Sequence, residues 1–342
     1  MKTDRPLLTI AIPTHGRASF LRELLVSLQP QLEDQPKVEL LISDNASPDE
    51  TAEVVREFER NGLQLRYLRN EVNIGPDANF LQCYEQAAGR YVWVFGDDDL
   101  LLDGGLATVV NVLEHGSPDY IFVAPYLFLE TIKEIRPRRR NVATTIVHDP
   151  IEMVTLVNLH ADLILISSGI VDKDRIAAIP HPPFSSLVGT NLVQLGWVLT
   201  SLRNLRCGIF VELGSLATRG ANSRGGFQAA RVFGESYRRA VSEMLEPGSA
   251  LARKLIGDHL RIWFPRNWLG FRENGEEARA QRRILSTAFQ DTYWYWVCAC
   301  PLIYAPRSMA QLWAKVLWGI ARIWKEQLSV AGKKGSCLPT EG

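Results

Sequence analysis

Residues 90–99 read RYVWVFGDDD, a strand-forming run that ends in three acids. Aromatic and β-branched side chains predict a buried strand, and Asp97, Asp98 and Asp99 follow where it would reach solvent. Like charges this close repel each other, so folding alone gives no reason for three. A divalent cation carrying a polyphosphate does, because hard cations bind carboxylate and phosphate oxygens together. Alternatively, Asp99 and Asp103 only favour the N-terminus of the next helix, for which one acid suffices.

The composition is ordinary for a soluble globular protein. The chain has 342 residues, 46% hydrophobic and 22% charged, enough for one large core or two smaller ones. Its five cysteines are scattered, and Cys298 and Cys300 stand too close together for a zinc pair. We therefore expect reduced thiols in a cytoplasmic protein. We expect no signal peptide, because residues 1–5 are polar and the apolar run at 7–12 is too short.

A net charge of zero conceals two parts of opposite sign. Residues 1–202 hold 17 Lys and Arg against 27 Asp and Glu, whereas residues 203–342 hold 21 against 11. This division suggests an acidic part built around a cation site and a basic part that faces anionic phosphates or a membrane. The alternative is a solvated surface whose composition drifts along the chain.

Strands alternate with helices in the first part of the chain. Strands are predicted at 7–13, 38–43 and 65–68, and helices at 18–32, 48–60 and 77–88. Such alternation predicts an α/β fold with a mainly parallel sheet and helices on both faces. Ligands of such sheets bind outside the carboxyl ends of the strands, and polar clusters at 14–17, 44–47 and 97–99 fall at those ends.

A turn at residues 73–79, NIGPDAN, precedes the third of these helices. Gly75 permits a backbone conformation that other residues avoid, and Pro76 suits the first turn of a helix. Alone, the motif is an ordinary turn and helix cap. Together with the polar clusters, it becomes a candidate part of a ligand site.

These motifs together resemble family 2 glycosyltransferases of the GT-A (Rossmann-like) fold. The resemblance rests on strands that run into Pro13-Thr14 and Asp44-Asn45, on the Asn-x-Gly turn, and on AGRY leading into the acids. It is specific over 7–115, weaker to about 220 and absent beyond. The FGDDD form resembles the abequosyltransferase-like branch of O-antigen and polysaccharide enzymes. No Gly-x-Gly-x-x-Gly follows the first strand, which disfavours a dinucleotide-binding domain.

The resemblance implies a nucleotide-sugar site at the sheet edge. The residues implied to border the donor are Pro13, Thr14, His15, Arg17, Asp44, Asn73, Gly75, Asn79, Asp97 and Asp98. Asp44 would bind the base, and Asp98 would lie near the ribose and diphosphate. Asp99, with help from Asp97, would bind Mg²⁺ or Mn²⁺, whose charge neutralises the departing diphosphate.

The chain departs from the family pattern at three places. Gly96 stands where many members have an acid, which leaves the division of tasks between Asp97 and Asp98 open. Phe80-Leu81 replaces a common Arg-Asn pair, so a usual diphosphate contact is missing or comes from elsewhere. Thr190-Asn191 occupies the usual Glu-Asp position, and neither residue is a base at neutral pH.

The catalytic base is therefore unassigned. His181, in a proline-rich loop, is a candidate, and the alternative is a histidine that only structures the loop. Asp162 and Asp172 are weaker candidates.

Beyond residue 115 we predict three further regions. A hairpin is predicted between 120 and 147 and a strand at 205–216, which completes a GT-A domain over 1–226 with a nucleotide-sugar half at 1–115 and an acceptor half at 116–226. Residues 227–330 are predicted to be helical, and 331–342 to form a disordered tail.

Residues 293–328 combine tryptophans with basic residues. The uncharged run at 292–306 is shorter than the ~20 residues that span a bilayer. Residues 307–328 keep a helical period and suit the interface of an anionic membrane. Packing on the catalytic domain is the alternative.

The resemblance implies an inverting glycosyltransferase, and we expect the protein to be cytoplasmic and peripheral on the inner face of the membrane. It would move a sugar from a nucleotide donor to a lipid-linked or polysaccharide acceptor, and we expect no nucleic-acid partner. The sequence identifies neither the sugar nor the acceptor. The alternatives are a metal-dependent nucleotidyltransferase and a catalytically silent sugar-nucleotide-binding module.

Overall fold

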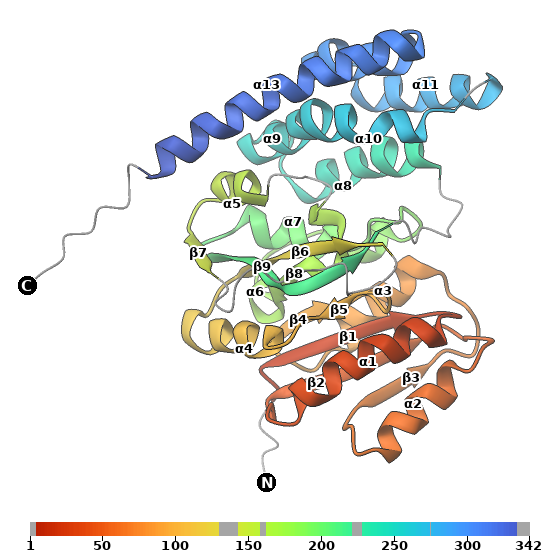
Figure 1. The fold of residues 1–342 in the computed structure, drawn as a ribbon, viewed down its shortest axis with the longest axis vertical. Helices are drawn as coiled ribbons and strands as arrows, with labels where there is room; N and C mark the ends of the chain where they lie inside the picture. The colour runs from red at the N-terminus through yellow and green to blue at the C-terminus, as the bar shows by residue number, and fades with distance from the viewer. Residues whose placement is uncertain (1–4, 130–142, 158–161, 221–227, 274, 334–342) are drawn as a thin grey trace, which may run out of the picture. The chain divides into compact units, whose positions relative to one another are not determined.

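The computed structural model describes residues 5–129, 143–157, 162–220, 228–273 and 275–333. Within them, nine strands form one mixed sheet in the order β3-β2-β1-β4-β8-β6-β9-β5, with β7 paired to β9 (Figure 1). The strands are β1 (Leu8–Thr14), β2 (Val38–Asp44), β3 (Arg66–Arg69), β4 (Tyr91–Val94), β5 (Leu100–Leu101), β6 (Tyr120–Phe128), β7 (Thr144–Val147), β8 (Gly169–Asp172) and β9 (Gly208–Arg219). The predicted α/β class is confirmed.

The first four strands are parallel to one another. β1 pairs with β2 and β4, and β2 pairs with β3. The connecting helices are α1 (Ala18–Leu32), α2 (Thr51–Arg60) and α3 (Pro76–Gln86), close to the predicted ranges. All four strands therefore end at the same edge of the sheet, where Thr14 ends β1 and Asp44 ends β2.

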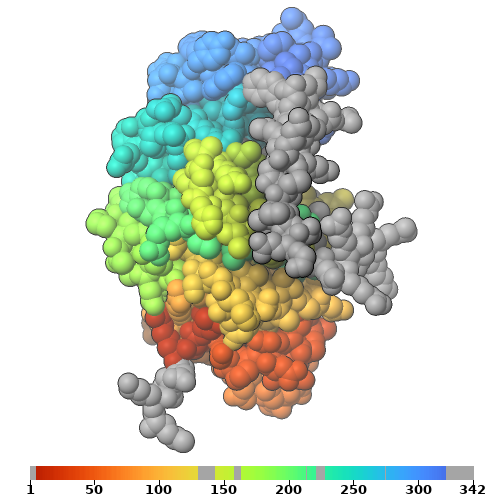
Figure 2. Space-filling view, turned by 90° about the vertical axis from the view of Figure 1, so that its left-hand side faces the viewer, coloured from red at the N-terminus to blue at the C-terminus, as the bar shows by residue number. Residues whose placement is uncertain are grey.

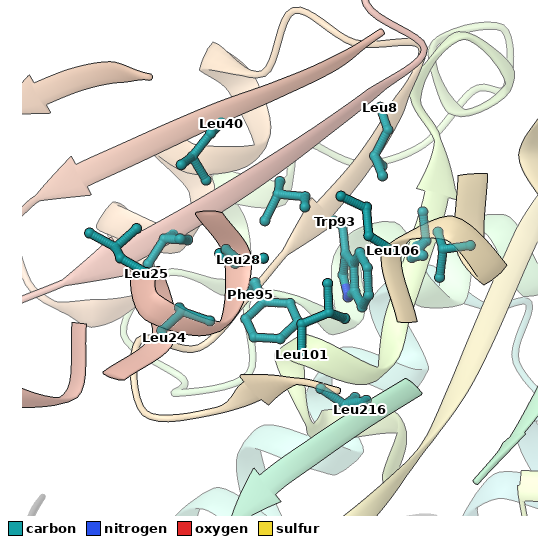
Figure 3. Close-up of a cluster of buried hydrophobic side chains, with 14 of the residues drawn as sticks. Leu8, Leu24, Leu25, Leu28, Leu40, Trp93, Phe95, Leu101, Leu106 and Leu216 are labelled. Atoms are coloured by element: carbon teal, nitrogen blue, oxygen red, sulfur yellow. The ribbon is translucent and has the colours of Figure 1, made fainter. Parts of the chain in front are cut away.

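A layer of apolar side chains joins α1 to the sheet (Figure 3). Leu24, Leu25 and Leu28 of α1 are fully buried, as are Leu8 of β1 and Trp93 of β4. Burial of one such side chain contributes ~1.5–3 kcal/mol. This packing fixes the strands whose ends carry the polar clusters.

The second part of the sheet contains antiparallel pairs. β8 lies antiparallel between β4 and β6, and β6 runs parallel to β9. The hairpin predicted between 120 and 147 is wrong, because β6 and β7 do not pair with each other. Both pair with the 12-residue β9, which comes from much later in the chain. The helices here are α4 (Gly105–Gly116), α5 (Pro150–Val157), α6 (Lys173–Ala177) and α7 (Leu195–Arg203).

The described residues from 228 on are helical, as predicted. They form α8 (Tyr237–Met244), α9 (Ala250–Asp258), α10 (Phe264–Phe271), α11 (Gly275–Phe289), α12 (Cys300–Tyr304) and α13 (Arg307–Lys333), with π-helical turns at Arg231–Ser236, His259–Trp263 and Tyr295–Ala299. No helix in the described ranges has the length and apolar character to cross a membrane. A tail was predicted at 331–342, and its residues from 334 on lie outside the described part of the structure.

The chain divides into two compact units. Unit 1 comprises residues 1–158, 162–227 and 239–252, and unit 2 comprises 159–161, 228–238 and 253–342. In Figure 2 the first elements of unit 1, red to gold, form one unbroken surface on the side shown. The boundary predicted after 226 stays a prediction, although the segment 239–252 groups with unit 1.

Candidate functional site

The three acids follow β4 at the edge where the parallel strands end. β4 ends at Val94, and the next residue, Phe95, is fully buried, so the acids begin directly after the core. A Cβ added at Gly96 would stand 3.1 Å from Asp99 Oδ2 and 3.3 Å from Asp98 Oδ1. Glycine therefore lets the carboxylates approach the backbone closely, which gives a physical reason for the absence of an acid at position 96.

Asp97 and Asp98 are held by the end of β1 and the start of α1. Thr14 Oγ1 donates to Asp97 Oδ2 at 2.8 Å, and Arg17 Nη1 donates to Asp97 Oδ1 at 3.0 Å. The same Arg17 nitrogen lies 3.2 Å from Asp98 Oδ2. The side chain of Asp97 is 5% exposed and that of Asp98 is 18% exposed. Asp98 is therefore the more accessible of these two acids.

Asp99 is held from the opposite side by residues that sequence reasoning missed. Ser167 Oγ donates to Asp99 Oδ2 at 2.6 Å and accepts from the amide of Gly96 at 2.8 Å. The amide of Arg219, at the end of β9, donates to Asp99 Oδ1 at 3.0 Å. Trp93 Nε1 donates to the carbonyl of Ser167 at 2.7 Å and fixes the serine in turn. The pair Ser167-Ser168 before Gly169 was the available signal, but nothing local linked it to an acid.

Burial disfavours the charged forms of two of the acids. It raises the pKa of Asp97 to about 6, against the opposing effect of Arg17. Burial and the negative charge of Asp98 together raise the pKa of Asp99 to about 7. For Asp97, the effect of burial therefore exceeds that of Arg17.

The acids fit a divalent cation by their chemistry. Carboxylate oxygens are the ligands that Mg²⁺ and Mn²⁺ prefer, and buried negative charge in excess favours a cation. The ligand geometry is not preformed, because the described residues contain no group of three His, Cys, Asp or Glu that converges on one point. Asp97 and Asp99 would have to turn toward a cation from their present partners.

Asp44 lies at the end of β2 and is completely buried. Its Oδ1 accepts from the amide of Ser47 at 2.8 Å, and its Oδ2 accepts from the hydroxyl of Tyr67 at 2.5 Å. Arg69 Nε lies 3.6 Å from the same Oδ2. The carboxylate therefore orders the loop after β2, and the contact with a nucleotide base stays a prediction.

The Asn-x-Gly turn contacts the ends of β1 and β2. Asn45 Nδ2 donates to Asn73 Oδ1 at 2.8 Å, and the amide of Gly75 donates to the same oxygen at 2.8 Å. Asn73 Nδ2 lies 3.0 Å from Nε2 of His15, which is exposed. Gly75 has φ +86°, the left-handed region that its position requires. The structure brings His15, Asn73 and Gly75 together at one edge.

Asn79 and Pro13 point into the protein instead. Asn79 is 3% exposed and pairs with Ser43: its Oδ1 accepts from Ser43 Oγ at 2.7 Å, and its Nδ2 donates to the carbonyl of Ser43 at 3.0 Å. Pro13 is buried in β1, in register with Ser43 of β2. These contacts fasten α3 to β2, and a donor contact for either residue stays a prediction.

His181 is not brought together with the acids by any described contact. It follows β8, which runs antiparallel to β4, so Asp172 at the end of β8 pairs with Tyr91 at the start of β4. The ring of His181 stacks on Phe184 with centroids 4.3 Å apart, and its Nδ1 lies 2.8 Å from the carbonyl of Pro182. These contacts are those of a histidine that orders its loop.

The two weaker candidates for the base are placed differently. Asp172 is 1% exposed, caps α6 and pairs with Arg90 at 2.8 Å, which is a structural set of contacts. Asp162 begins the short 3-10 helix Asp162–Ile164, and its side chain lies outside the described part of the structure. The base therefore remains unassigned.

Asp77, at the start of α3, holds the loop in which a base was expected. Its Oδ2 accepts from the amide of Asn191 at 2.7 Å, while its Oδ1 has no hydrogen-bond partner in the described structure. Burial raises the pKa of Asp77, against the effect of the loop amides. Gly189 and Asn191 both have left-handed backbones, with φ +86° and +59°. The loop thus wraps its amides around a carboxylate that comes from α3.

Sequence comparison relates the first half of the chain to known glycosyltransferases. Residues 9–171 match the model of Glycosyl transferase family 2. An abequosyltransferase of Salmonella typhimurium is 40% identical over 116 residues, which are 34% of this chain and 35% of that protein. The GalNAc(5)-diNAcBac-PP-undecaprenol beta-1,3-glucosyltransferase of Campylobacter jejuni is 32% identical over 112 residues, 32% of this chain and 36% of that protein. The alignments thus span about a third of these relatives.

Solved structures show the same fold over most of the chain. Residues 1–349 of Staphylococcus aureus TarS, in complex with UDP, superpose with a TM-score of 0.63 at 16% identity, covering 92% of this chain and 91% of that one. A mannosyltransferase of Pyrobaculum calidifontis, in complex with GDP-Man and Mn²⁺, gives a TM-score of 0.51 at 15% identity, covering 94% and 87%. Residues 9–171 therefore match the glycosyl transferase family 2 domain, and the chain has an α/β fold of the GT-A type.

Proposed function

We propose that the chain is an inverting glycosyltransferase that moves a sugar from a nucleotide-sugar donor to a lipid-linked or cell-surface polysaccharide acceptor. The observation that carries the proposal is the buried acid cluster, which lies beside residues from the ends of β1 and β9. The family 2 domain supports the reaction class. The UDP bound by TarS and the undecaprenol-linked acceptor named for the Campylobacter enzyme support the two substrate classes.

The reaction exchanges one bond at the anomeric carbon for another. The bond to the diphosphate oxygen breaks, and its electron pair leaves with the nucleoside diphosphate. The acceptor oxygen attacks from the opposite face, forms the new bond and gives its proton to a base. A single displacement of this kind inverts the configuration of the sugar.

Asp99 and Asp97 are the residues that would hold Mg²⁺ or Mn²⁺. When bound, such a cation supplies neutralisation of the charge that grows on the departing diphosphate. Asp98, the more exposed neighbour of Asp97, would approach the ribose and diphosphate. The Mn²⁺ in the Pyrobaculum structure supports the choice of metal. His15, Asn73 and the loop after Asp44 would border the nucleotide.

A catalytically silent binding module is the second candidate. One observation favours it, namely that no catalytic base is assigned. Thr190 and Asn191 stand where the family usually has Glu-Asp, and both have structural contacts: Thr190 Oγ1 donates to the carbonyl of Leu187, and the amide of Asn191 donates to Asp77. Such a module would bind a nucleotide sugar without turning it over.

The test is the release of nucleotide from a panel of nucleotide sugars with Mn²⁺, with Mg²⁺ and with EDTA. Slow metal-dependent release of nucleoside diphosphate supports transfer, pyrophosphate indicates a nucleotidyltransferase, and binding without release indicates the silent module. We expect Asp99→Asn to reduce metal-dependent release on the order of 100-fold. Asp103→Asn, an exposed acid four residues away, is the matched control and should stay within twofold of the wild type.

We also propose that the protein is cytoplasmic and binds an anionic membrane peripherally through unit 2. Large apolar side chains are exposed there: Tyr293, Trp296, Tyr304, Met309, Leu312, Val316, Trp318 and Ile320. Arg307 and Lys315 are exposed on the same helix, α13, and suit anionic headgroups. The opposite side of α13 packs within unit 2 through Ala310, Ala314 and Leu317. The described cysteines are free, which supports a reducing compartment.

Flotation with vesicles tests this surface. We expect binding to vesicles that contain anionic lipid, weaker binding to phosphatidylcholine alone, and loss of binding in Leu312→Glu. Val26→Glu introduces the same charge at an exposed apolar residue of unit 1, and this control should still float. Equal flotation of both variants would contradict the proposal, and a dimer that Leu312→Glu dissociates would assign the surface to a second copy.

A further inference from the structure

Arg17 occupies an unusual position between two acids. It immediately precedes α1, and its Nη1 alone contacts both Asp97 Oδ1 and Asp98 Oδ2, at 3.0 and 3.2 Å. About a third of its side chain is exposed. One guanidinium nitrogen thus bridges two carboxylates at the entrance to the cluster.

The rest of the guanidinium is not committed. In the described structure, the side-chain contacts of Arg17 are those of Nη1, which leaves Nε and Nη2 without a protein partner. A guanidinium binds phosphate most strongly through two parallel N–H donors. Arg17 therefore has the donors to bind a diphosphate if it turns away from the acids.

The acids, in turn, are only partly neutralised by Arg17. A single nitrogen, Arg17 Nη1, serves both carboxylates. A divalent cation would bring twice the charge of a guanidinium to the same oxygens. A guanidinium and a divalent cation at the same Asp97 oxygen repel each other, so each weakens the binding of the other.

We propose that Arg17 and the divalent cation compete for Asp97 and Asp98, and that Arg17, once displaced, binds the diphosphate of the donor. This inference rests on the proposed function and adds to it an exchange of partners by one residue. Arg17 then keeps the acids paired until the cation arrives, and afterwards supplies positive charge to the leaving group.

The exchange predicts opposite effects of one substitution. In Arg17→Gln, we expect Mn²⁺ alone to bind about tenfold more tightly by calorimetry, because its competitor is gone. With saturating Mn²⁺, we expect the nucleoside diphosphate that binds best among UDP, GDP, CDP and dTDP to bind about tenfold more weakly. A residue with only a structural role would weaken both, and one that only binds donor would leave Mn²⁺ affinity unchanged.

Arg22→Gln is the matched control for net charge. Arg22 lies in α1, just after Arg17, and pairs with Glu57 at 2.6 Å instead of with the acids. We expect it to leave both affinities within about twofold of the wild type. If Arg22→Gln tightens Mn²⁺ binding as much as Arg17→Gln does, the effect is one of general charge and the proposal is overturned.

A second measurement covers the case in which Arg17→Gln does not fold. Crystals of the wild type soaked with Mn²⁺ alone should show Mn²⁺ at Asp97 and Arg17 Nη1 moved out of hydrogen-bond range of Asp97. Mn²⁺ bound with the Arg17 contacts intact would overturn the inference but keep the proposed metal site. No Mn²⁺ binding to the wild type, alone or with any of the four nucleotides, would overturn the metal site itself.

Discussion

The burial of Asp99 opposes folding when its carboxyl group is charged. Burial and the neighbouring Asp98 raise its pKa to about 7, and burial raises that of Asp97 to about 6. An acid whose pKa is higher in the folded state binds protons more tightly there than in the unfolded chain. This contribution to stability is therefore complete below the unfolded pKa of about 4 and is lost as pH rises through 6 to 7.

We expect the free energy of unfolding in EDTA to fall by up to roughly 4 kcal/mol between pH 5 and pH 8. Urea unfolding at each pH measures it. Asp99→Asn should flatten much of the fall, whereas the exposed control Asp103→Asn should keep the wild-type slope. Excess Mn²⁺ should reduce the fall, because a cation stabilises the ionised acids. A flat wild-type profile in EDTA would show that the acids are not buried as described.

Two adjacent serines differ in the hydrogen bonding of their hydroxyl groups. Ser167 and Ser168 are both buried, but Ser167 Oγ bonds Asp99 and the Gly96 amide, whereas Ser168 Oγ has no partner in the described structure. We expect Ser167→Ala to cost about 1–3 kcal/mol and Ser168→Ala to stay within about 0.5 kcal/mol of the wild type by urea unfolding. Equal losses would mean that the Ser167 bonds contribute nothing beyond packing.

The site residues differ in how far the sequence could assign them. Asp97, Asp98 and Asp99 stand together in the chain, and their acidity is visible without a fold. Asn79 and Asp44 have suitable chemistry but face inward, and the direction of a side chain depends on packing across elements. Ser167 is even less predictable, because its contact with Asp99 spans 68 residues.

At the scale of elements, the loop at 188–193 depends on a carboxylate from another helix. Asp77 of α3 binds the Asn191 amide across 114 residues of sequence. In Asp77→Ala this amide loses its acceptor, and we expect it to exchange hydrogen about 10- to 100-fold faster.

Asp77→Asn keeps an acceptor oxygen and is the matched control, with exchange within about threefold of the wild type. Mass spectrometry of the peptide that covers 188–193 reports both variants. Slow exchange in Asp77→Ala would mean that the loop is held by packing instead.

Local elements could be predicted and distant pairings could not. The helix expected at 18–32 is α1 with the same ends, because its apolar period and the polar turn before it are local signals. The hairpin expected between 120 and 147 failed because β9 lies between β6 and β7. Two strands near in sequence predict a hairpin unless a later strand pairs with both, and no local pattern reveals the later strand.

For the whole molecule, the segment 239–252 belongs to unit 1 although residues of unit 2 precede it. Arg239 Nη2 donates to the carbonyl of Ser186 at 2.8 Å, and Ser186 Oγ donates to Glu243 at 2.9 Å. We expect a chain that ends at residue 226 to melt at least about 5 °C below the full chain, because these contacts and the apolar burial behind them are lost.

Two substitutions in the full chain provide the control, one at Arg239 in unit 1 and one at Arg231 in unit 2. Arg239→Ala should lower stability by about 1 kcal/mol, since Arg239 also bonds Ser186. Arg231→Ala removes a pair with Glu235 in which both side chains are more than 60% exposed, and should change stability by less than about 0.5 kcal/mol. Calorimetry distinguishes these outcomes, and an unshifted melt of the 226-residue chain would place the segment outside the cooperative unit.

The unbroken sheet has a consequence for protein engineering. β8 hydrogen-bonds to β4 on one side and to β6 on the other, so the strands before and after residue 115 belong to one continuous sheet. Chimeras that join two homologues at residue 115 would pair β8 of one parent with β4 of the other. Grafts confined to the loops beyond the strand ends leave that ladder untouched, and under the proposed function they are the sounder route to an altered sugar preference.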